Sequence, residues 1–233
     1  MICWQLFALY PLLDSNIKGV GMTCSVSWIL FDFGGVLSEE GFRGGLGALA
    51  REQGLDPATV QRAGVACVFE TGYVTGHADG ETFWRTLKDR TGLRGSEPVL
   101  RRVVLDHFRL RPWMLELVRQ IRKGGTRCAI LSDQVDWLDT LNERDAFFPL
   151  FDRIYNSYHL GQSKQDPQIF ARVTADLGIS PGEALFVDDS PDNVRRAESQ
   201  GLSGIVHAEK QPFLEQIRAY CPDLDIDRLE AMV

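Results

Sequence analysis

The chain has 233 residues, of which 44% are hydrophobic and 24% are charged, a composition typical of a globular protein with a sizeable buried core. Its 32 Asp and Glu residues outnumber its 25 Lys and Arg residues, which gives a formal net charge of −7. This balance argues against a nucleic-acid partner and against an anionic membrane, but it is compatible with a local basic pocket for a small anionic substrate.

The chain begins with the apolar segment MICWQLFALYPLL. This segment is too short to span a bilayer and lacks the basic leader of a signal peptide. Met22 is a second candidate for the natural start, so two interpretations of residues 1–21 stay open: a native segment or an addition. We therefore expect residues 1–25 to form an N-terminal extension outside the folded core.

The five cysteines are scattered, odd in number and without a C-x-x-C pair. This pattern predicts reduced thiols in a cytoplasmic protein, rather than a disulfide or zinc framework. Each is expected to be a small core residue. They are Cys3, Cys24, Cys67, Cys128 and Cys221.

Residues 26–32 form an apolar, β-rich run that predicts a buried strand. Residues 41–111 then show helical spacing, Gly and Pro breaks and no convincing strand, which indicates a helical insert. From Pro112 onward, strands alternate with helices. The predicted strands are 126–132, 152–158, 183–189 and 203–208, and the predicted helices are 112–125, 135–144, 166–178, 191–201 and one from 212 onward.

This alternation implies right-handed βαβ units and a parallel sheet covered on both faces. The predicted fold class is therefore α/β, with a doubly wound, Rossmann-like core and a helical cap inserted after the first strand. The expected core domain comprises residues 26–40 and 112–233, and the expected cap domain comprises residues 41–111.

Ligands of open α/β sheets bind outside the carboxyl ends of the strands. The sequence places acidic, hydroxyl and cationic residues at these ends, so we expect them to converge on one edge of the sheet. They are Asp32 after the first strand, Ser132 and Asp133 after the second, Asp188 and Asp189 after a later one, and Lys164 just before a helix.

Four segments, in order, resemble the motifs of the haloacid dehalogenase (HAD) superfamily of hydrolases. They are FDFGGVL, ILSDQ, GQSKQDPQIF and FVDDSPDN, and the helical insert resembles the small α-helical, C1-type cap of that family. Each motif is weak alone, whereas four motifs at predicted strand ends or helix starts form a strong signal.

The resemblance implies a Mg²⁺-dependent phosphatase in which Asp32 attacks phosphorus and forms an aspartyl-phosphate. It implies that the metal binds the Asp32 side chain, the Gly34 carbonyl and Asp189. Asp188 would support the metal or the lysine. Four other residues would complete the site. Ser132, with backbone N–H groups at the start of its helix, would bind phosphate together with Asp133 and Lys164, and Lys164 would also neutralise its charge. Asn193 would support the metal site.

A second aspartate is usual in the family's phosphatases two residues after the nucleophile, and here that position is Gly34. General acid–base help is worth roughly 10²–10⁴-fold in rate. Three compensations stay open: a leaving group that needs little protonation, Asp133 with a raised pKa, or a cap residue. The candidate cap residues are Glu70, His77 and Asp79, which lie in a Gly-punctuated stretch.

The first functional hypothesis is hydrolysis of a small soluble phosphomonoester by a monomer or homodimer in the cytoplasm. The glycine at position 34 also motivates 2-haloacid dehalogenation, although the acidic pair at 188–189 suits magnesium better. A third hypothesis, a non-catalytic ligand-binding protein on a decayed HAD fold, is motivated by Gly34, Asp133 and Gln165.

Overall fold

The structure is a computed structural model that describes residues 24–232. Its centre is a single sheet of parallel strands in the order β3-β2-β1-β4-β5, as predicted for a doubly wound α/β fold. The strands are β1 (Trp28–Phe31), β2 (Arg127–Ser132), β3 (Arg153–Asn156), β4 (Ala184–Asp188) and β5 (Ser203–Val206).

Side chains of β1 alternate between two hydrophobic clusters, one on each face of the sheet. Ile29 and Phe31 pack with residues of α5 (Pro112–Lys123), α6 (Trp137–Asp145) and α10 (Lys210–Tyr220). Trp28 and Leu30 pack on the other face with residues of α8 (Gln168–Leu177) and α9 (Pro191–Ser199). Successive strand residues point to opposite faces, so a strand covered on both faces must be apolar throughout.

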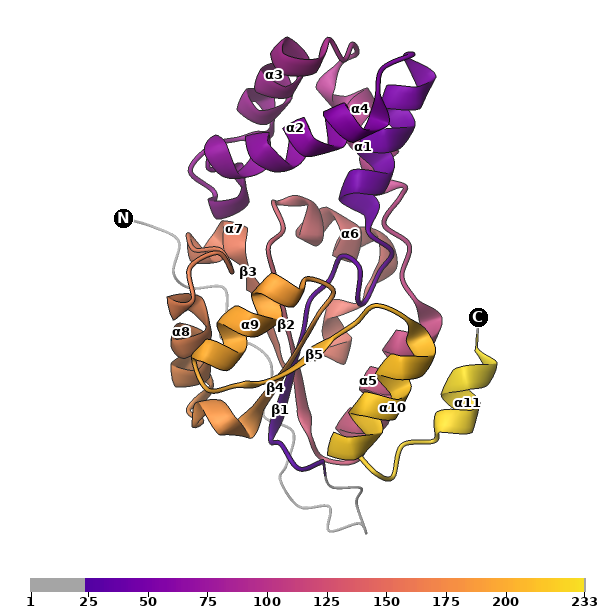
Figure 1. The fold of residues 1–233 in the computed structure, drawn as a ribbon, viewed down its shortest axis with the longest axis vertical. Coiled ribbons are helices and arrows are strands. Elements are labelled where there is room, and N and C mark those ends of the chain that lie inside the picture. The colour runs from indigo at the N-terminus through magenta and orange to yellow at the C-terminus, as the bar shows by residue number, and fades with distance from the viewer. Residues whose placement is uncertain (1–23, 233) are drawn as a thin grey trace.

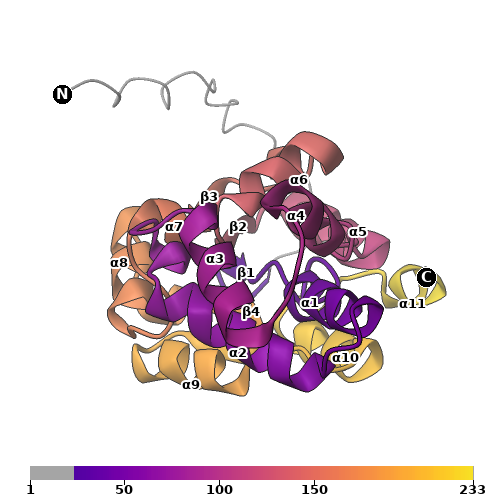
Figure 2. The same ribbon diagram turned by 90° about the horizontal axis from the view of Figure 1, so that it is seen from above.

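The predicted helical insert follows β1 and covers the end of the sheet where the parallel strands terminate (Figures 1 and 2). It comprises α1 (Gly41–Glu52), α2 (Pro57–Glu70), the 3₁₀ turn η1 (Tyr73–Thr75), α3 (Gly80–Thr91) and α4 (Glu97–Leu105), which we call the cap. Local sequence starts these helices: Asp56 and Asp79 accept hydrogen bonds from backbone N–H groups at the starts of α2 and α3.

Two neighbouring chain segments connect the cap to the sheet. Ser38, on the segment that leaves the sheet, forms isolated β-bridges with Gly34 and with Leu110, which lies on the segment that returns from the cap. The Glu39 amide donates to the Arg109 carbonyl at 2.8 Å, and the Arg111 amide donates to the Leu37 carbonyl at 2.9 Å. The cap therefore joins the sheet through a hydrogen-bonded pair of linkers next to the end of β1.

The cysteine prediction is wrong for one pair, because Cys24 and Cys221 form a disulfide across a sequence separation of 197 residues. The segment before β1 runs beside the end of α10, where the Ser25 amide donates to the Tyr220 carbonyl at 2.7 Å. Spacing in the sequence cannot reveal this proximity. Cys67 and Cys128 are free and buried, as expected of small core residues, and Cys3 lies outside the described residues.

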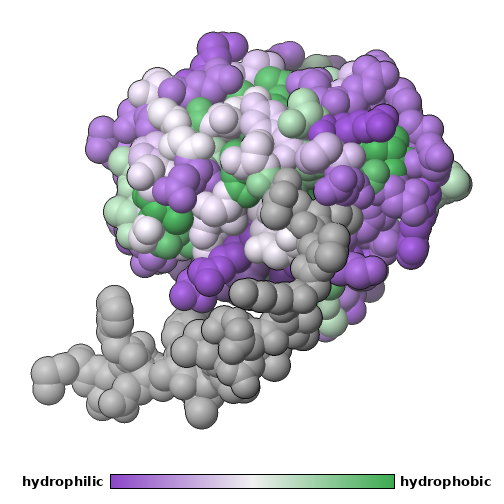
Figure 3. Space-filling model, turned by 90° about the horizontal axis from the view of Figure 1, so that it is seen from below, coloured by the Kyte–Doolittle hydropathy of each residue, from purple (hydrophilic) through white to green (hydrophobic). Residues whose placement is uncertain are grey.

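The remaining elements complete the core. They are the short helix α7 (Ser157–Leu160), the closing helix α11 (Ile226–Ala231), and the 3₁₀ turns η2 (Phe148–Leu150) and η3 (Pro181–Glu183). The face opposite the cap mixes hydrophilic residues with small separate hydrophobic spots (Figure 3). Within residues 24–232, none of the helices combines the length and apolar character that crossing a bilayer requires.

Candidate active site

A cavity of about 570 Å³ lies between the cap and the carboxyl ends of the strands. Most of the residues singled out from the sequence line it, although they come from four distant segments. They are Asp32, Gly34, Ser132, Asp133, Lys164, Asp189 and Asn193. Asp188 lies directly beneath them, fully buried.

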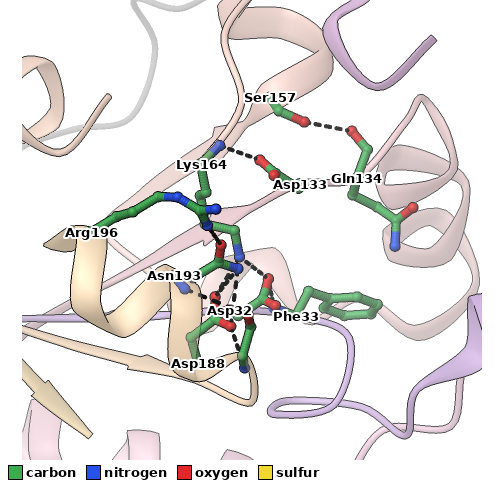
Figure 4. A network of polar contacts seen from close by, with 10 residues as sticks. Asp32, Phe33, Asp133, Gln134, Ser157, Lys164, Asp188, Asn193 and Arg196 are labelled. Atoms are coloured by element: carbon green, nitrogen blue, oxygen red, sulfur yellow. Dashed lines mark hydrogen bonds and ion pairs between the residues drawn. The ribbon is translucent and has the colours of Figure 1, made fainter. Parts of the chain in front are cut away.

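Lys164 links the first and last of these segments (Figure 4). Its Nζ atom lies 3.0 Å from Asp32 Oδ1 and 2.6 Å from Asp188 Oδ2. The lysine side chain is 1% exposed, so this is a buried ion pair rather than a solvated surface lysine. A buried ammonium group needs such partners, because an unpaired charge in this environment is strongly unfavourable.

Asp188 organises the lysine rather than facing the cavity. Besides Lys164, its carboxylate accepts hydrogen bonds from the Ser190 amide at 2.8 Å and from the Asn193 side-chain amide at 3.2 Å. Ser190 caps α9 and thereby places Asn193 in the first turn of that helix. Asp188 thus contacts Lys164 and Asn193, whereas Asp189 is exposed and lines the cavity.

Asp32, Asp188 and Asp189 each offer one oxygen atom to a cluster whose members lie within 4.8 Å of one another. Gly35 makes this approach sterically feasible, because it has a φ of +79° and a side chain there would collide with the Asp189 carboxylate. The glycine that follows Gly34 is therefore required by conformation and by space. Three carboxylates at this spacing form a donor set of hard oxygen atoms that suits Mg²⁺.

The pKa of Asp32 is raised to about 7, mainly by burial and also by the neighbouring Asp188 and Asp189, whereas Lys164 opposes the change. The pKa of Asp189 is also raised, first by burial and then by Asp188. Burial alone would lower the pKa of Lys164, but Asp188, Asp32 and Asp133 outweigh it and keep the amine protonated. A single ammonium group thus faces an excess of carboxylates, and a cation bound among them would lower their pKa values.

Ser132 and Asp133 follow β2, at the edge of the cavity. The Ser132 hydroxyl lies near the Asp32 carboxyl and lowers its pKa, and Asp133 accepts a hydrogen bond from the Lys164 amide at 2.8 Å. Burial raises the pKa of Asp133 to about 6. The helix after this loop, α6, begins only at Trp137, so Ser132 does not lie at a helix start as the sequence suggested.

The cap residues considered as replacement acids do not line the cavity. Glu70 pairs with Arg90 at 2.7 Å, and the Asp79 carboxylate caps α3. The His77 ring bonds the Thr75 hydroxyl at 2.8 Å. Of the groups proposed to compensate for Gly34, only Asp133 contributes to the wall of the cavity.

Sequence reasoning overlooked Arg196 and Glu40 in the cavity wall. Arg196 follows Asn193 by three residues on α9 and donates to its side-chain oxygen at 2.9 Å, so helical spacing could have identified it. Glu40 caps α1 at the cap linker, and burial raises its pKa. Arg43, singled out only weakly from the sequence, also lines the cavity.

A second overlooked group supports the loop after the nucleophile candidate. Arg111 Nη1 donates to the Gly35 carbonyl at 2.6 Å, and its guanidinium pairs with Glu39 at 2.9 Å. His207 Nδ1 lies 2.9 Å from the same carbonyl. These contacts tie the Gly34–Gly35 turn to the cap linker on one side and to the end of β5 on the other.

The α/β sheet, the cavity at its carboxyl edge and the Asp–Lys–Asp cluster define a hydrolase of the HAD type. A family model for haloacid dehalogenase-like hydrolases matches residues 26–201. The chain belongs to this family.

Curated relatives are similar over limited stretches. The chain is 30% identical over 112 residues to mouse acyl-CoA dehydrogenase family member 10. The matched stretch covers 46% of this chain and 10% of that protein. It is 27% identical over 123 residues to phosphoglycolate phosphatase of Pseudomonas putida, covering 52% of this chain and 45% of that enzyme. The chain thus spans less than half the length of either relative.

Solved structures share the fold across most of the chain. A HAD family enzyme of Bacteroides thetaiotaomicron, solved with magnesium and inorganic phosphate, superimposes with a TM-score of 0.61 at 22% identity, covering 81% of this chain and 98% of that one. L-2-haloacid dehalogenase of Xanthobacter autotrophicus also gives a TM-score of 0.61, at 20% identity, covering 88% of this chain and 87% of that one. These similarities support the fold.

Proposed function

We propose that this protein is a Mg²⁺-dependent phosphatase that hydrolyses a small phosphorylated metabolite through an aspartyl-phosphate on Asp32. One observation carries the proposal: at the floor of the cavity, the Asp32 carboxylate contacts the Lys164 ammonium group and forms an oxygen cluster with Asp188 and Asp189. The phosphatase relative and the magnesium and phosphate complex of a structural neighbour support the same class of reaction.

The donor set fits a magnesium ion. Asp32, Asp189 and the Gly34 carbonyl would hold it, with Asp188 as a further oxygen donor or as a support. Burial, and after it the neighbouring carboxylates, raises the pKa values of Asp32 and Asp189, and a nearby cation would favour their ionised forms. When bound, the ion would supply positive charge to the carboxylates and to the phosphoryl oxygens.

Asp32 supplies the nucleophile. Its oxygen forms a bond to phosphorus while the bond from phosphorus to the leaving oxygen breaks, and water then hydrolyses the acyl phosphate and restores the carboxylate. The Phe33 amide donates to Asp32 Oδ1 at 2.7 Å, and Lys164 contacts the same oxygen. Both contacts hold the carboxylate in one orientation, which reduces the entropy that the reaction step must lose.

Lys164 and Ser132 would bind the phosphoryl group. The lysine is held by Asp188 at 2.6 Å, so its charge is already oriented before the substrate enters. Positive charge that is fixed in advance stabilises the charge that develops on phosphoryl oxygens. Gly34 offers no proton to the leaving oxygen, so this site favours substrates whose leaving group is weakly basic or receives its proton from Asp133 or water.

The test is phosphate release from acetyl phosphate and p-nitrophenyl phosphate, with Mg²⁺ or with EDTA. We expect turnover only with Mg²⁺ and its loss in Asp32→Asn, while Asp227→Asn, an exposed change on α11, retains it. A second measurement is independent of turnover: Mg²⁺ should raise the melting temperature of the wild type and raise it less in Asp189→Asn. Equal turnover in wild type and Asp32→Asn would contradict the proposal.

The second candidate function is 2-haloacid dehalogenation, which the absence of an acid at position 34 favours. It predicts chloride release from chloroacetate in the presence of EDTA. If neither phosphate nor chloride is released, while phosphate still raises the melting temperature, the protein is a ligand-binding member of the family.

A further inference from the structure

Helix α2 has two apolar faces. One face, formed by Val60, Gly64 and Cys67, is buried in the cap, and Gly64 lies so close to α1 that an added Cβ would meet Leu46 Cδ1 at 2.2 Å. The second face, formed by Val65, Val68 and Phe69, lines the active-site cavity. Positions i, i+3 and i+4 lie on one side of a helix, so this second face is a continuous apolar surface turned toward the space where a substrate would lie.

The rest of the cap also contributes mainly apolar side chains to the wall of the cavity. Its other apolar residues in the wall are Phe42 and Val74, Phe108 of the returning linker adds a further apolar side chain, and Arg43 is the one charged residue that the described cap adds. The ionic and amide side chains of the wall come instead from the sheet edge, from α9 and from the Glu40 linker. The cavity is thus divided into a polar floor and a largely apolar roof.

We infer that the group carried by the phosphate is an apolar, ring-sized hydrocarbon or aromatic moiety, rather than a polyhydroxylated sugar. This inference rests on the proposed phosphatase function and specifies its substrate class. The phosphoryl group belongs at the floor, beside Asp32 and Lys164, so the remainder of the substrate must lie against α2. A cavity of about 570 Å³ also leaves room for more than a two-carbon acid beside the phosphate.

The physical reason is the cost of removing hydroxyl groups from water. A sugar pressed against Val65, Val68 and Phe69 would bury hydroxyls without hydrogen-bond partners on that side. Each such hydroxyl weakens binding on the order of 10-fold. An apolar ring in the same place has no hydroxyl hydrogen bonds with water to lose, and burying its surface against the apolar roof favours binding.

A matched pair of substrates tests this inference. Cyclohexylmethyl phosphate and glucose 6-phosphate each carry a six-membered ring on a CH₂–O–phosphate group, and they differ mainly in ring hydroxyls. With Mg²⁺, we expect kcat/KM for cyclohexylmethyl phosphate to exceed that for glucose 6-phosphate by about 100-fold. Acetyl phosphate serves as an activated reference for phosphoryl transfer itself.

A pair of variants on α2 tests the role of its second face. Val68→Thr places a hydroxyl in the roof at nearly constant volume and should lower the ratio of the two kcat/KM values by about 3- to 10-fold. Val60→Thr makes the same change on the buried face of the same helix, where the residue is 1% exposed. Because Val60 does not line the cavity, this variant should leave the ratio unchanged even if it lowers stability.

The outcomes are distinguishable. Turnover of acetyl phosphate together with equal or better use of glucose 6-phosphate overturns this inference and leaves the phosphatase proposal standing. A fall in the ratio that is the same in both threonine variants also overturns it. Absence of phosphate release from all three compounds overturns the phosphatase proposal, and this inference with it.

Discussion

Gly34 leaves space beside the nucleophile candidate. A Cβ built there meets only Phe108 Cε1, at an ordinary contact distance of 3.7 Å. Unlike Gly35, this residue does not have a positive φ, so a larger residue is compatible with its backbone. The site could therefore accept the acid that the family's phosphatases usually carry two residues after the nucleophile.

We predict that Gly34→Asp increases kcat/KM for an unactivated alkyl phosphomonoester by about 100-fold, because a general acid typically contributes 10²–10⁴-fold. Acetyl phosphate, whose leaving group needs little protonation, should gain far less. Phosphate release with Mg²⁺ measures both rates. Gly34→Asn is the matched control, with the same shape and no acidic proton, and equal gains in the two variants would contradict the prediction.

Residue identities of the site were predictable because each lies at a strand end or a helix start. Asp32, Ser132 and Asp189 required only the positions of three strands and the rule that their carboxyl ends meet. Arg111 and His207 were not predictable, because their contact with the Gly35 carbonyl joins residues separated by 76 and 172 positions. Neither belongs to a local pattern.

At the scale of elements, the cap is attached to the sheet domain by a polar cluster as well as by its linkers. Tyr73 of η1 donates a hydrogen bond to Asp136, the residue before α6, and Arg101 of α4 pairs with the same carboxylate at 3.3 Å. Burial and the Asp136 carboxylate raise the pKa of Tyr73, which keeps the hydroxyl protonated as a donor. Nearby, the Ser157 hydroxyl donates to the Val74 carbonyl at 2.7 Å.

We predict that Asp136→Ala loosens the cap. Loss of two hydrogen bonds, at about 1 kcal/mol each, shifts the balance toward an open cap by about 30-fold. KM should rise by several-fold with a smaller change in kcat, and hydrogen exchange should increase in η1 and α4.

Asp139→Ala is the control for this prediction. Asp139 lies one turn further along α6 but pairs with His159 at 2.7 Å, within the sheet domain. This variant should change neither KM nor the exchange of cap amides. If both alanine variants alter KM equally, the cluster at Asp136 does not control the position of the cap.

Element types followed well from the sequence, whereas their boundaries and partners did not. Continuous apolar runs identified β1, β2 and β4, because buried parallel strands need apolar residues on both faces. The start of α6 was misplaced by two residues, since Val135 fits an apolar helical pattern but lies in the loop before Trp137. The two apolar faces of α2 could be counted in the sequence, but only packing shows which one meets the cavity.

At the scale of the whole molecule, the Cys24–Cys221 bridge joins the two ends of the described core. It closes a loop of 197 residues, and chain-entropy arguments give a loop of this length up to about 5 kcal/mol of stabilisation. The bridge precedes β1, at the opposite end of the strand from Asp32. Its effect should therefore be on stability rather than on the site.

We predict that Cys221→Ser lowers the free energy of unfolding by about 2–5 kcal/mol and leaves kcat/KM of the folded protein unchanged. Urea denaturation with and without dithiothreitol measures the effect. The reductant should shift the midpoint of the wild type and have no effect on the serine variant. Identical midpoints for oxidised and reduced wild type would show that the bridge contributes nothing.

The same bridge determines what a broken backbone does to this protein. Every peptide bond between residues 24 and 221 lies inside one covalent ring, and this includes all of α1 to α4. A protease that cuts once in a cap loop would therefore release no fragment: the two pieces would migrate together on a gel until a thiol was added. Survival of a nicked enzyme would then depend on its redox environment rather than on the position of the cut.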